Sequence, residues 1–402
     1  MTYSSVEAKS IQELCKVIDC EHKTAPYVEK SDYLVVRTSN VRNGRMVMED
    51  MKYTTLEGFK TWTQRAVPEA GDVLFTREAP AGESCLVPKD KKVCMGQRMV
   101  MLRPNREKVD PTFLSLVLAT EKSKFDILRL SIGSTVSRIN IADIKKLRIA
   151  APPLLEQRKV AQILSTWDKA IATSEQLLAN SQQQKKALMQ KLFSGKSRFS
   201  NFDDKFRYRF FYELLNIDSK NLGEGISGDY LFDYISLSDV KSGRINDHLE
   251  RHFFKDAPSR ARRILTEGDI LFSTVRPNLQ GFAKVGGNHK KCIASTGFSV
   301  LTPKDKVCGN YIYHYLYSSH ITAQVNTLVV GTNYPAINSS DVARLRIYCP
   351  GYEEQKRIAL VLDNCDKDTE ALNHKLFLLK QEKKALMQQL LTGKRRVKTE
   401  VA

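Results

Sequence analysis

Long apolar runs and a leader-like start are both missing from this 402-residue chain. No apolar stretch approaches the ~20 residues that a membrane-spanning helix needs. The first residues, MTYSSVEAKSIQELCK, lack the basic-then-apolar order of a secretory signal peptide. Hydrophobic residues still make up 42% of the chain, which is enough to form real cores. We therefore expect a cytoplasmic protein of two or three folded domains that does not enter a membrane.

Metal and disulfide motifs are missing as well. The eight cysteines include no Cys-x-x-Cys pair and no close Cys/His cluster, so the sequence indicates neither a zinc site nor a disulfide framework. The seven histidines show no metal-ligand spacing, and no His-Glu-x-x-His motif occurs. These absences predict reduced thiols and no metal bound by this chain.

Enzyme signatures are absent in the same way. Residues 194–197 read SGKS, which resembles the end of a phosphate-binding loop, but no glycine stands five residues before Gly195. There is no Asn-Pro-Pro-aromatic element of an amino-methyltransferase, no Gly-rich methyl-donor loop and no Pro-Asp…Asp/Glu-x-Lys nuclease core. We expect a non-catalytic chain without a cofactor of its own.

The charge of the chain is strongly one-sided. The formal net charge is +18, and Lys plus Arg outnumber Asp plus Glu in each of the segments 1–155, 156–198, 199–353 and 354–402. No single basic tail carries the excess. This distribution favours a polyanionic partner that folded parts of the chain contact along its whole length.

One long stretch of sequence occurs twice. Residues 156–198 and 354–396 share the elements EQ(K/R), KKALMQ and GK, at an offset of 198 residues. Apolar residues recur in both with alternating steps of three and four, which is the spacing of a coiled-coil seam. Gly195 and Gly393 stand where helix C-caps are expected. The predicted seam consists of Val160, Leu164, Trp167, Ile171, Leu178, Leu188, Leu192, Ile358, Leu362, Leu372, Leu376, Leu379, Leu386 and Leu390.

The remaining sequence repeats in the same order. The strand-like GDVLFT at residues 71–76 is matched by GDILFS at 268–273, whereas the surface loops share little. We therefore predict an α+β fold, with two mixed α/β globular domains in tandem, separated and followed by two long helices that form an antiparallel coiled coil. The predicted boundaries are 1–153 and 199–351 for the globular domains and 154–198 and 352–402 for the helical segments.

Taken together, these features resemble the specificity (S) subunit of Type I restriction–modification enzymes. The resemblance rests on the GDVLF and GDILFS strands, on the loops from Gly133 to Asn140 and from Gly331 to Asn338, and on the two EQ…KKALMQ helices. It covers nearly the whole chain. It implies two target recognition domains, each reading one half of a bipartite site in double-stranded DNA.

The same resemblance implies the partners. The long helices would set the distance between the half-sites and dock two methyltransferase (M) subunits, and two restriction/motor (R) subunits would complete the assembly. S-adenosylmethionine, ATP and Mg would be used by those partners and not by this chain. The shared KKALMQ element contains Lys185, Lys186, Lys383 and Lys384, and one lysine of each pair falls on the predicted seam. These lysines could contact phosphates or partner subunits, or could pack beside the seam with their ammonium groups in water.

Candidate DNA-binding residues follow from the chemistry of base recognition. Arg suits guanine and Asn or Gln suits adenine, whereas Lys, Ser and Thr serve phosphates. Because the loops of the two halves differ, we expect two different half-sites. The candidates in the first half are Arg42, Arg45, Arg77, Gln97, Arg98, Ser134, Thr135 and Arg138. Those in the second half are Lys241, Arg244, Arg260, Arg262, Arg263, Arg276, Asn278, Thr332, Asn333 and Tyr334.

Two other functions remain open at this stage. A stand-alone sequence-specific DNA-binding regulator would be expected to carry a helix-turn-helix or a similar reading helix, and none is obvious. A coiled-coil adaptor that binds only proteins would not need a basic excess in all four segments. Salt-dependent DNA binding separates the adaptor from the other two.

Overall fold

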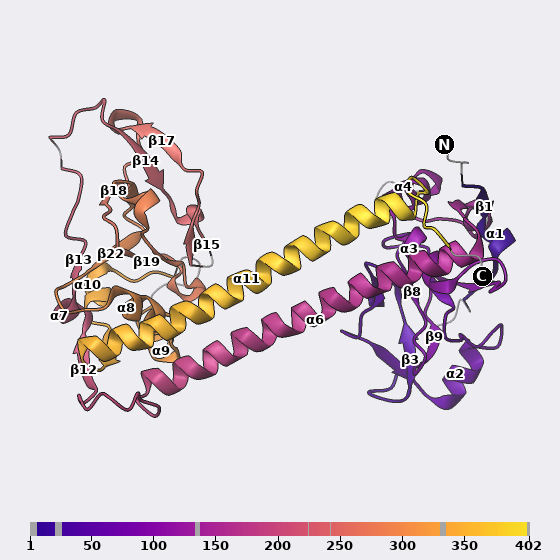
Figure 1. Cartoon of the computed structure of the whole chain (residues 1–402), viewed down its shortest axis with the longest axis horizontal. Coiled ribbons are helices and arrows are strands. Elements are labelled where there is room, and N and C mark those ends of the chain that lie inside the picture. Colours follow the sequence, from indigo (N-terminus) through magenta and orange to yellow (C-terminus); the bar gives the residue numbers. More distant parts are fainter. Residues whose placement is uncertain are drawn as a thin grey trace. The chain divides into compact units, whose positions relative to one another are not determined.

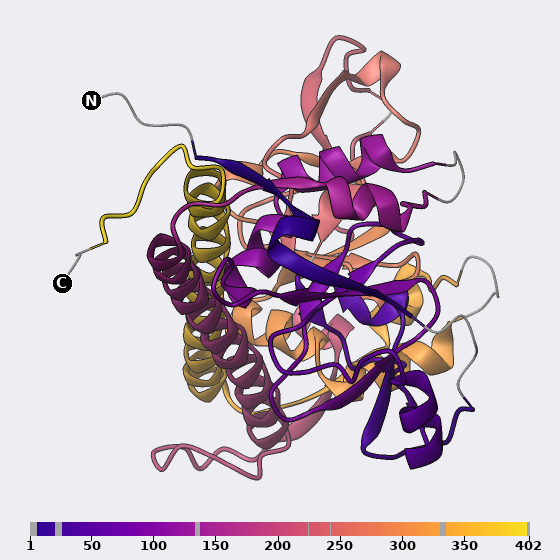
Figure 2. The ribbon, with the colours of Figure 1, turned by 90° about the vertical axis from the view of Figure 1, so that its right-hand side faces the viewer.

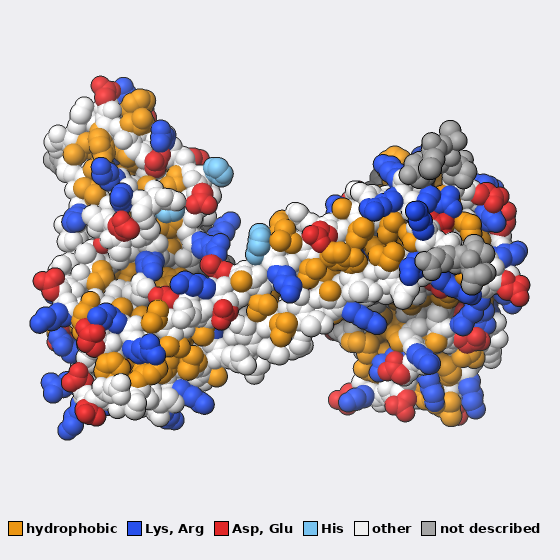
Figure 3. All heavy atoms as spheres, in the orientation of Figure 1, with side chains coloured by type: hydrophobic (Ala, Val, Ile, Leu, Met, Phe, Trp, Pro, Cys, Tyr) orange, Lys and Arg blue, Asp and Glu red, His pale blue; other side chains and the backbone are white. Residues whose placement is uncertain are grey.

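A computed structural model describes residues 6–20, 26–132, 137–223, 225–241, 243–329 and 335–399 (Figure 1). The chain divides into two compact units. Unit 1 consists of Met1–Glu175 and His374–Ala402, and unit 2 of Gln176–Asn373. Within the described ranges, no helix combines the length and the apolar character needed to cross a membrane. Basic side chains occur over both units on the face that Figure 3 shows.

Unit 1 is built on a four-stranded antiparallel sheet in the order β2-β10-β7-β8. A three-stranded sheet of order β6-β3-β9, a β4–β5 hairpin and a β1–β11 pair complete its strands. The bounds are β1 Ala8–Ser10, β2 Cys15–Asp19, β3 Tyr33–Val36, β4 Val41–Arg42, β5 Arg45–Met46, β6 Lys52–Thr54, β7 Val73–Thr76, β8 Ser84–Leu86, β9 Lys92–Met95, β10 Met99–Pro104 and β11 Arg148–Ala150. The helices are α1 Ile11–Leu14, η1 Thr38–Asn40, α2 Leu56–Trp62, α3 Pro111–Leu118, α4 Glu121–Leu130, α5 Ile141–Lys146 and the long α6 Leu154–Phe193.

Unit 2 repeats most of this order, but has the short helix η3 and an extra strand, β18, where unit 1 has the helix α2. Its four-stranded antiparallel sheet has the order β13-β22-β19-β20, beside a second sheet β17-β14-β21-β18, a β15–β16 hairpin and a β12–β23 pair. The strands are β12 Arg207–Phe210, β13 Leu215–Ile217, β14 Leu231–Ile235, β15 Val240–Lys241, β16 Arg244–Ile245, β17 Glu250–Phe253, β18 Ala261–Ile264, β19 Ile270–Ser273, β20 Phe282–Lys284, β21 Ile293–Ser295, β22 Phe298–Pro303 and β23 Arg346–Cys349. The helices are α7 Phe211–Leu214, η2 Leu237–Asp239, η3 Phe254–Asp256, η4 Pro277–Leu279, η5 Gly287–His289, α8 Gly309–Leu316, α9 Ser319–Leu328, α10 Ser339–Ala343 and the long α11 Tyr352–Leu390.

Local side chains explain two departures from the sequence pattern. The stretch PTFLSLVLATEKSKFDILRL at residues 111–130 predicts a single helix. The helix breaks at Thr120, whose side chain accepts a hydrogen bond from the Ser123 amide and so caps a second helix. The run YLVVRTSNV at residues 33–41 predicts a strand, but β3 ends at Val36. There the buried Asn40 amide donates to two carbonyls and accepts from Arg37 N–H, which holds a turn in place of the strand.

The expected helices are present at full length. α6 has 40 residues and α11 has 39, and Gly195 and Gly393 follow them with positive φ of 68° and 75°. The first part of α6 and the last part of α11 belong to unit 1, and their other parts belong to unit 2. In Figure 2, the helices lie together along one side of the strands of unit 1. Every residue of the predicted seam is buried or half-buried.

The helix ends are part of the unit cores. Val160 and Leu164 of α6 pack with Leu390 of α11 in the main core of unit 1. In unit 2, Leu192 of α6 packs with Ile358 and Leu362 of α11 in the equivalent core. Each core therefore contains apolar side chains from both long helices.

In each unit, a lysine of one long helix pairs with an aspartate of the other. Lys383 Nζ lies 2.7 Å from the Asp168 carboxylate in unit 1, and in unit 2 Lys185 pairs with Asp366. Both seam lysines thus have carboxylate partners on the other helix. Because position 168 repeats at 366 and position 185 at 383, the two pairs are the same contact made twice with the roles of the helices exchanged.

The EQ and GK ends of the repeat are joined in the same reciprocal way. Arg396 binds the Glu156 carboxylate at 2.6 Å in unit 1, and Arg198 binds Glu354 at 2.7 Å in unit 2. Glu156 is 6% exposed and Glu354 is 1% exposed, so each carboxylate has lost its water and needs its arginine.

The adjacent glutamines connect each helix start to its unit. Gln157 Nε2 donates to Pro152 C=O at 2.8 Å, and Asp110 N–H donates to Gln157 Oε1 at 2.9 Å. Gln355 bonds Pro350 C=O and Cys308 N–H equivalently in unit 2. The repeated EQ element therefore has a structural reason at both helix starts. Its glutamate binds an arginine that follows the other long helix, and its glutamine bonds backbone groups of its own unit.

Removal of one guanidinium should destabilise unit 1 strongly. Arg396→Ala leaves the Glu156 carboxylate buried without its cation, so the free energy of unfolding should fall by about 3 kcal/mol. Urea unfolding followed by circular dichroism measures this loss. Arg395→Ala is the matched control, because Arg395 is exposed and its change should cost less than about 0.5 kcal/mol. Equal effects of the two changes would contradict the role of the pair.

The same pair should make stability depend on pH. Burial by itself would raise the pKa of Glu156, but hydrogen bonds from Arg396 and from Val397 N–H outweigh it and leave this pKa below its ordinary value. A carboxyl with a lowered folded pKa stabilises the fold above its unfolded pKa of about 4.3, and this contribution disappears as the pH falls. Urea unfolding from pH 7 to pH 3 should therefore show a smaller acid-induced loss in Glu156→Gln than in the unchanged chain. Identical pH profiles would exclude Glu156 as a source of the loss.

Candidate nucleic-acid interface

Several candidates from the first half meet where β7 ends and β10 begins. Arg77 N–H donates to Arg98 C=O at 2.9 Å, and Ile139 N–H donates to Arg77 C=O at 3.0 Å. The backbones of Arg138 and Glu78 form an isolated antiparallel β-bridge. The ends of two sheet strands and the segment before α5 are thereby held side by side, with Gln97 exposed in the turn before β10.

One carboxylate organises the two exposed arginines of this edge. Glu78 lies 3.2 Å from Arg98 Nε and 3.3 Å from Arg138 Nε. The Glu78 side chain is 17% exposed, whereas those of Arg98 and Arg138 are 57% and 55% exposed. In each of these two pairs the arginine atom closest to the Glu78 carboxylate is Nε. Glu78 was not among the sequence candidates, because its partners come from distant parts of the chain.

Arg77 has a different environment from its neighbours. It is 5% exposed, its Nη1 lies 3.3 Å from the Asp19 carboxylate, and its Nε donates to Ile139 C=O at 3.4 Å. These contacts connect β7 with β2 and with the segment before α5. The observed role of Arg77 is to hold the edge together.

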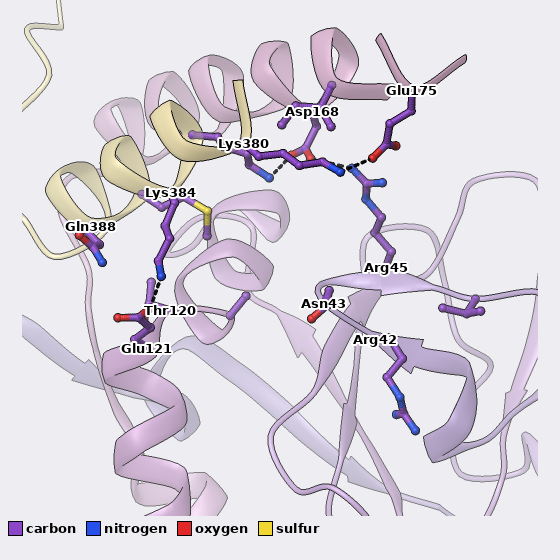
Figure 4. Close-up of a pocket in the computed structure, with 15 residues that line it drawn as sticks. Arg42, Asn43, Arg45, Thr120, Glu121, Asp168, Glu175, Lys380, Lys384 and Gln388 are labelled. Atoms are coloured by element: carbon purple, nitrogen blue, oxygen red, sulfur yellow. Dashed lines mark hydrogen bonds and ion pairs between the residues drawn. The ribbon is translucent and has the colours of Figure 1, made fainter. Parts of the chain in front are cut away.

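The arginines of the β4–β5 hairpin are occupied by protein atoms. Arg42 Nη1 donates to Thr38 C=O and to Val41 C=O at 2.6 and 2.7 Å. Arg45 extends from β5 to Asp168 of α6, with an Nη2–Oδ1 distance of 3.0 Å. Figure 4 shows this contact beside the ion pairs Lys380–Glu175 and Lys384–Glu121, around an open cavity of about 580 Å³. The network ties the hairpin and α4 to the two long helices within unit 1.

Unit 2 has the same backbone hydrogen bonds and β-bridge at the equivalent edge, which we call the backbone frame, but not the same charged side chains. Thr274 N–H donates to Gly297 C=O at 2.9 Å, Ile337 N–H donates to Thr274 C=O at 3.0 Å, and Val275 bridges Ala336. Arg98, Glu78 and Arg138 of unit 1 thus correspond to Gly297, Val275 and Ala336. The positions that carry two cations and an anion in unit 1 carry no charge in unit 2.

The polar candidates of unit 2 lie on the neighbouring turn. Arg276 is exposed, and its N–H donates to Pro335 C=O at 2.7 Å, which fixes the turn to the segment before α10. Asn278 is exposed on η4. On the β15–β16 hairpin, Lys241 is exposed, and Arg244 pairs with Glu370 of α11 in the way that Arg45 pairs with α6.

The three arginines at 260–263 have separate environments. Arg260 is exposed. The Arg262 guanidinium lies 5.1 Å from the centre of the Phe254 ring. Arg263 is 3.0 Å from the Asp218 carboxylate with a side chain only 16% exposed, so it contributes to packing within unit 2.

Five candidates lie outside the residues that the structure describes, namely Ser134, Thr135, Thr332, Asn333 and Tyr334. The described residues contain no group of three or more His, Cys, Asp or Glu side chains that could hold a metal ion. All eight cysteines are free thiols. Burial raises the pKa of Cys15, Cys85 and Cys94 to about 12, so these thiols are unreactive at neutral pH.

Comparisons with known proteins agree with this architecture. A family model described as the Type I restriction modification DNA specificity domain matches residues 3–180 and 228–381. A putative type I restriction enzyme MjaX specificity subunit from Methanocaldococcus jannaschii is 26% identical over 426 aligned residues, which cover 98% of this chain and 94% of that protein.

Two solved structures share the fold. The S subunit of a Type-I restriction-modification system from M. genitalium has a TM-score of 0.58 at 15% identity, over 96% of both chains. A chain from a structure that addresses complex assembly and conformational transition of the type I R-M system has a TM-score of 0.59 at 19% identity, over 97% of this chain and 98% of that one. The chain belongs to the Type I restriction-modification DNA specificity family.

Proposed function

We propose that this chain is the non-catalytic DNA specificity subunit of a Type I restriction–modification complex. Residues 1–153 and 199–351 would act as two target recognition domains on one asymmetric, bipartite site in double-stranded DNA. Residues 154–198 and 352–402 would form the antiparallel coiled coil between them. Family membership and the match over nearly the full length of a specificity subunit support this assignment.

The observation that carries the proposal is a shared backbone frame with different side chains. Arg98, Glu78 and Arg138 occupy positions in unit 1 that Gly297, Val275 and Ala336 occupy in unit 2. A shared frame would present each domain to DNA in the same way, and exchanged side chains would make different base contacts. Two different half-sites are therefore expected, and a palindromic site would contradict this part of the proposal.

Backbone conformation adds independent support. Arg98 and Arg276 have positive φ of 67° and 48°, in the left-handed region that residues with a Cβ rarely adopt. Such conformations cost free energy and concentrate at functional sites, where surrounding structure maintains them. Arg98 precedes β10 and Arg276 follows β19, so each unit has an exposed arginine in a left-handed conformation near this edge, at positions that do not correspond in the repeat.

The reciprocal contacts of the long helices support the spacer role. The pairs Lys383–Asp168 and Lys185–Asp366 repeat one contact with the helices exchanged, as an antiparallel coiled coil with approximate two-fold symmetry requires. Two recognition domains related by such a symmetry would suit half-sites that face the same side of a duplex, about one helical turn or ~34 Å apart.

The proposed partners follow from this role. Two methyltransferase subunits would dock on the coiled coil, and two restriction/motor subunits would join the complete complex in the cytoplasm. Those subunits would use S-adenosylmethionine, ATP and Mg. The net charge of +18 supports binding to DNA, because basic side chains that neutralise phosphates release counterions.

Modified-base sequencing tests the proposal directly. A methylation-free host should be made to express this chain with the methyltransferase subunit of its own system. Methyladenine should appear in a gapped, asymmetric motif, with one adenine in each half on opposite strands. Salt-dependent, sequence-specific DNA binding without any methyltransferase would favour a stand-alone regulator, and absence of DNA binding would favour a protein adaptor.

Substitution of Arg98 tests the unit 1 edge. If Arg98 reads a base, Arg98→Ala should weaken specific binding by about 1–3 kcal/mol and relax one position of one half-site. Fluorescence anisotropy with the specific duplex and with a shuffled duplex measures both affinities. Lys91→Ala, at an exposed basic residue before β9, is the control and should preserve the specificity ratio. An unchanged ratio in Arg98→Ala would remove Arg98 from the reading residues.

Glu78→Gln tests whether this edge faces phosphates. The change removes one negative charge between Arg98 and Arg138. If the edge contacts DNA, affinity at low salt should rise and the slope of log K against log salt should steepen by up to about one. Anisotropy titrations at increasing NaCl concentration give the slope. A slope equal to that of the unchanged protein would show that the edge lies away from the phosphates.

A further inference from the structure

Leu279 is the most exposed large hydrophobic side chain among the described residues, with 69% of its surface in contact with solvent. It lies on η4, beside Asn278 and Arg276. Sequence reasoning singled out both of those polar residues but not Leu279. A single exposed leucine is ordinary, so its surroundings decide whether it has a role.

The turn that carries Leu279 is held firmly. Leu279 N–H donates to Arg276 C=O at 2.9 Å, and Gln280 N–H donates to Pro277 C=O at 3.0 Å. Pro277 is buried, and Gln280 Nε2 lies 3.3 Å from Thr322 Oγ1 on α9. The leucine is therefore presented to solvent by a fixed backbone.

Comparison with unit 1 shows that Leu279 belongs to an insertion. Thr76 N–H donates to Glu83 C=O, and Ser273 N–H donates to Gly281 C=O, so the two turns close with the same bond. The turn in unit 1 contains residues 77–82, and that in unit 2 contains residues 274–280, which is one residue more.

Left-handed residues locate the difference within the turn. Ala79 and Gly82 have positive φ in unit 1, as Arg276 and Gln280 have in unit 2. In unit 1, Pro80 and Ala81 lie between the left-handed residues, whereas in unit 2 Pro277, Asn278 and Leu279 do. The single Ala81 is thus replaced by Asn278 and Leu279.

The insertion lies at the candidate interface of unit 2. Arg276 N–H donates to Pro335 C=O, and Val275 bridges Ala336. An exposed amide followed by an exposed apolar side chain matches the major-groove edges of A·T pairs. A carboxamide can bond adenine N6 and N7 together, and the thymine 5-methyl group is the one apolar group at that edge.

We propose that Leu279 is a specificity-determining residue that packs against a thymine 5-methyl group in the half-site read by unit 2, next to an adenine bound by Asn278. The inference rests on the proposed function. Both side chains are exposed on the same short turn, so they would contact neighbouring base pairs. Unit 1, with Ala81 in their place, lacks this contact.

The test is a double-substitution cycle on the assembled complex with its methyltransferase, using duplexes of the site that methylation sequencing defines. Each thymine of the two half-sites is replaced singly by uracil, which removes only the methyl group. At one thymine in the unit 2 half-site, uracil should weaken binding of the unchanged complex about 3- to 10-fold, as expected for one buried methyl contact. The Leu279→Ala complex should bind the thymine duplex about as weakly as the unchanged complex binds the uracil duplex. It should also bind the uracil and thymine duplexes equally well.

Two controls separate folding from recognition. Uracil substitutions in the unit 1 half-site should have the same effect on the unchanged complex and on the Leu279→Ala complex. Replacement of Asn278 and Leu279 by a single alanine copies the turn length of unit 1 and should relax only the unit 2 half-site in modified-base sequencing.

The outcomes also separate this inference from the proposed function. If the unchanged complex does not prefer its site over a shuffled duplex, the proposed function fails. If it prefers the site but Leu279→Ala retains full sensitivity to uracil, or no thymine in the unit 2 half-site is sensitive, only the Leu279 inference is overturned. It is overturned equally if Leu279→Ala binds DNA normally but loses the methyltransferase, since the leucine would then contact protein.

Discussion

The structure depends on burying the apolar seam of two long helices together with one carboxylate at each helix start. Glu156 and Glu354 are almost fully buried, so each must meet an arginine that arrives from the far end of the other repeat. Seam residues of both helices also complete the core of each unit. Neither core can close until distant chain segments have met, since Glu156 and Arg396 are 240 residues apart in sequence and Arg198 and Glu354 are 156 apart. Such long-range contacts give the fold a high contact order.

Repetition made much of the architecture predictable. The two EQ…GK stretches, free of internal proline and glycine, predicted long helices whose ends the structure places at Phe193 and Leu390. Short-range details were less accessible. The break at Thr120 and the end of β3 at Val36 depend on single side chains that satisfy backbone groups locally, and hydrophobic periodicity does not register them. The aspartate partners of Lys185 and Lys383 lie on the other long helix. These ion pairs could be predicted only by someone who already knew which residues of the two helices lie opposite each other.

The candidate interface was predictable by residue type but not by environment. Sequence reasoning selected arginines near strand ends, and Arg98 and Arg138 do lie together on an exposed edge. It could not distinguish them from Arg77 and Arg263, whose mostly buried guanidiniums bind carboxylates. The sequence around Glu78 gave no reason to select it, because its partners Arg98 and Arg138 come near only when the chain folds. Leu279 did leave one, namely a turn one residue longer than its counterpart in the other repeat.

The division of the long helices between the units has an evolutionary consequence. Unit 2 is a single uninterrupted segment, Gln176–Asn373, and unit 1 is made of the residues on either side of it. The ion pairs Lys185–Asp366 and Arg198–Glu354 lie wholly inside that segment, and Lys383–Asp168 and Arg396–Glu156 lie wholly outside it. Recombination between two related genes, with breakpoints inside the helix codons near 175 and 373, would therefore exchange an entire unit as one cassette without separating any of these four pairs.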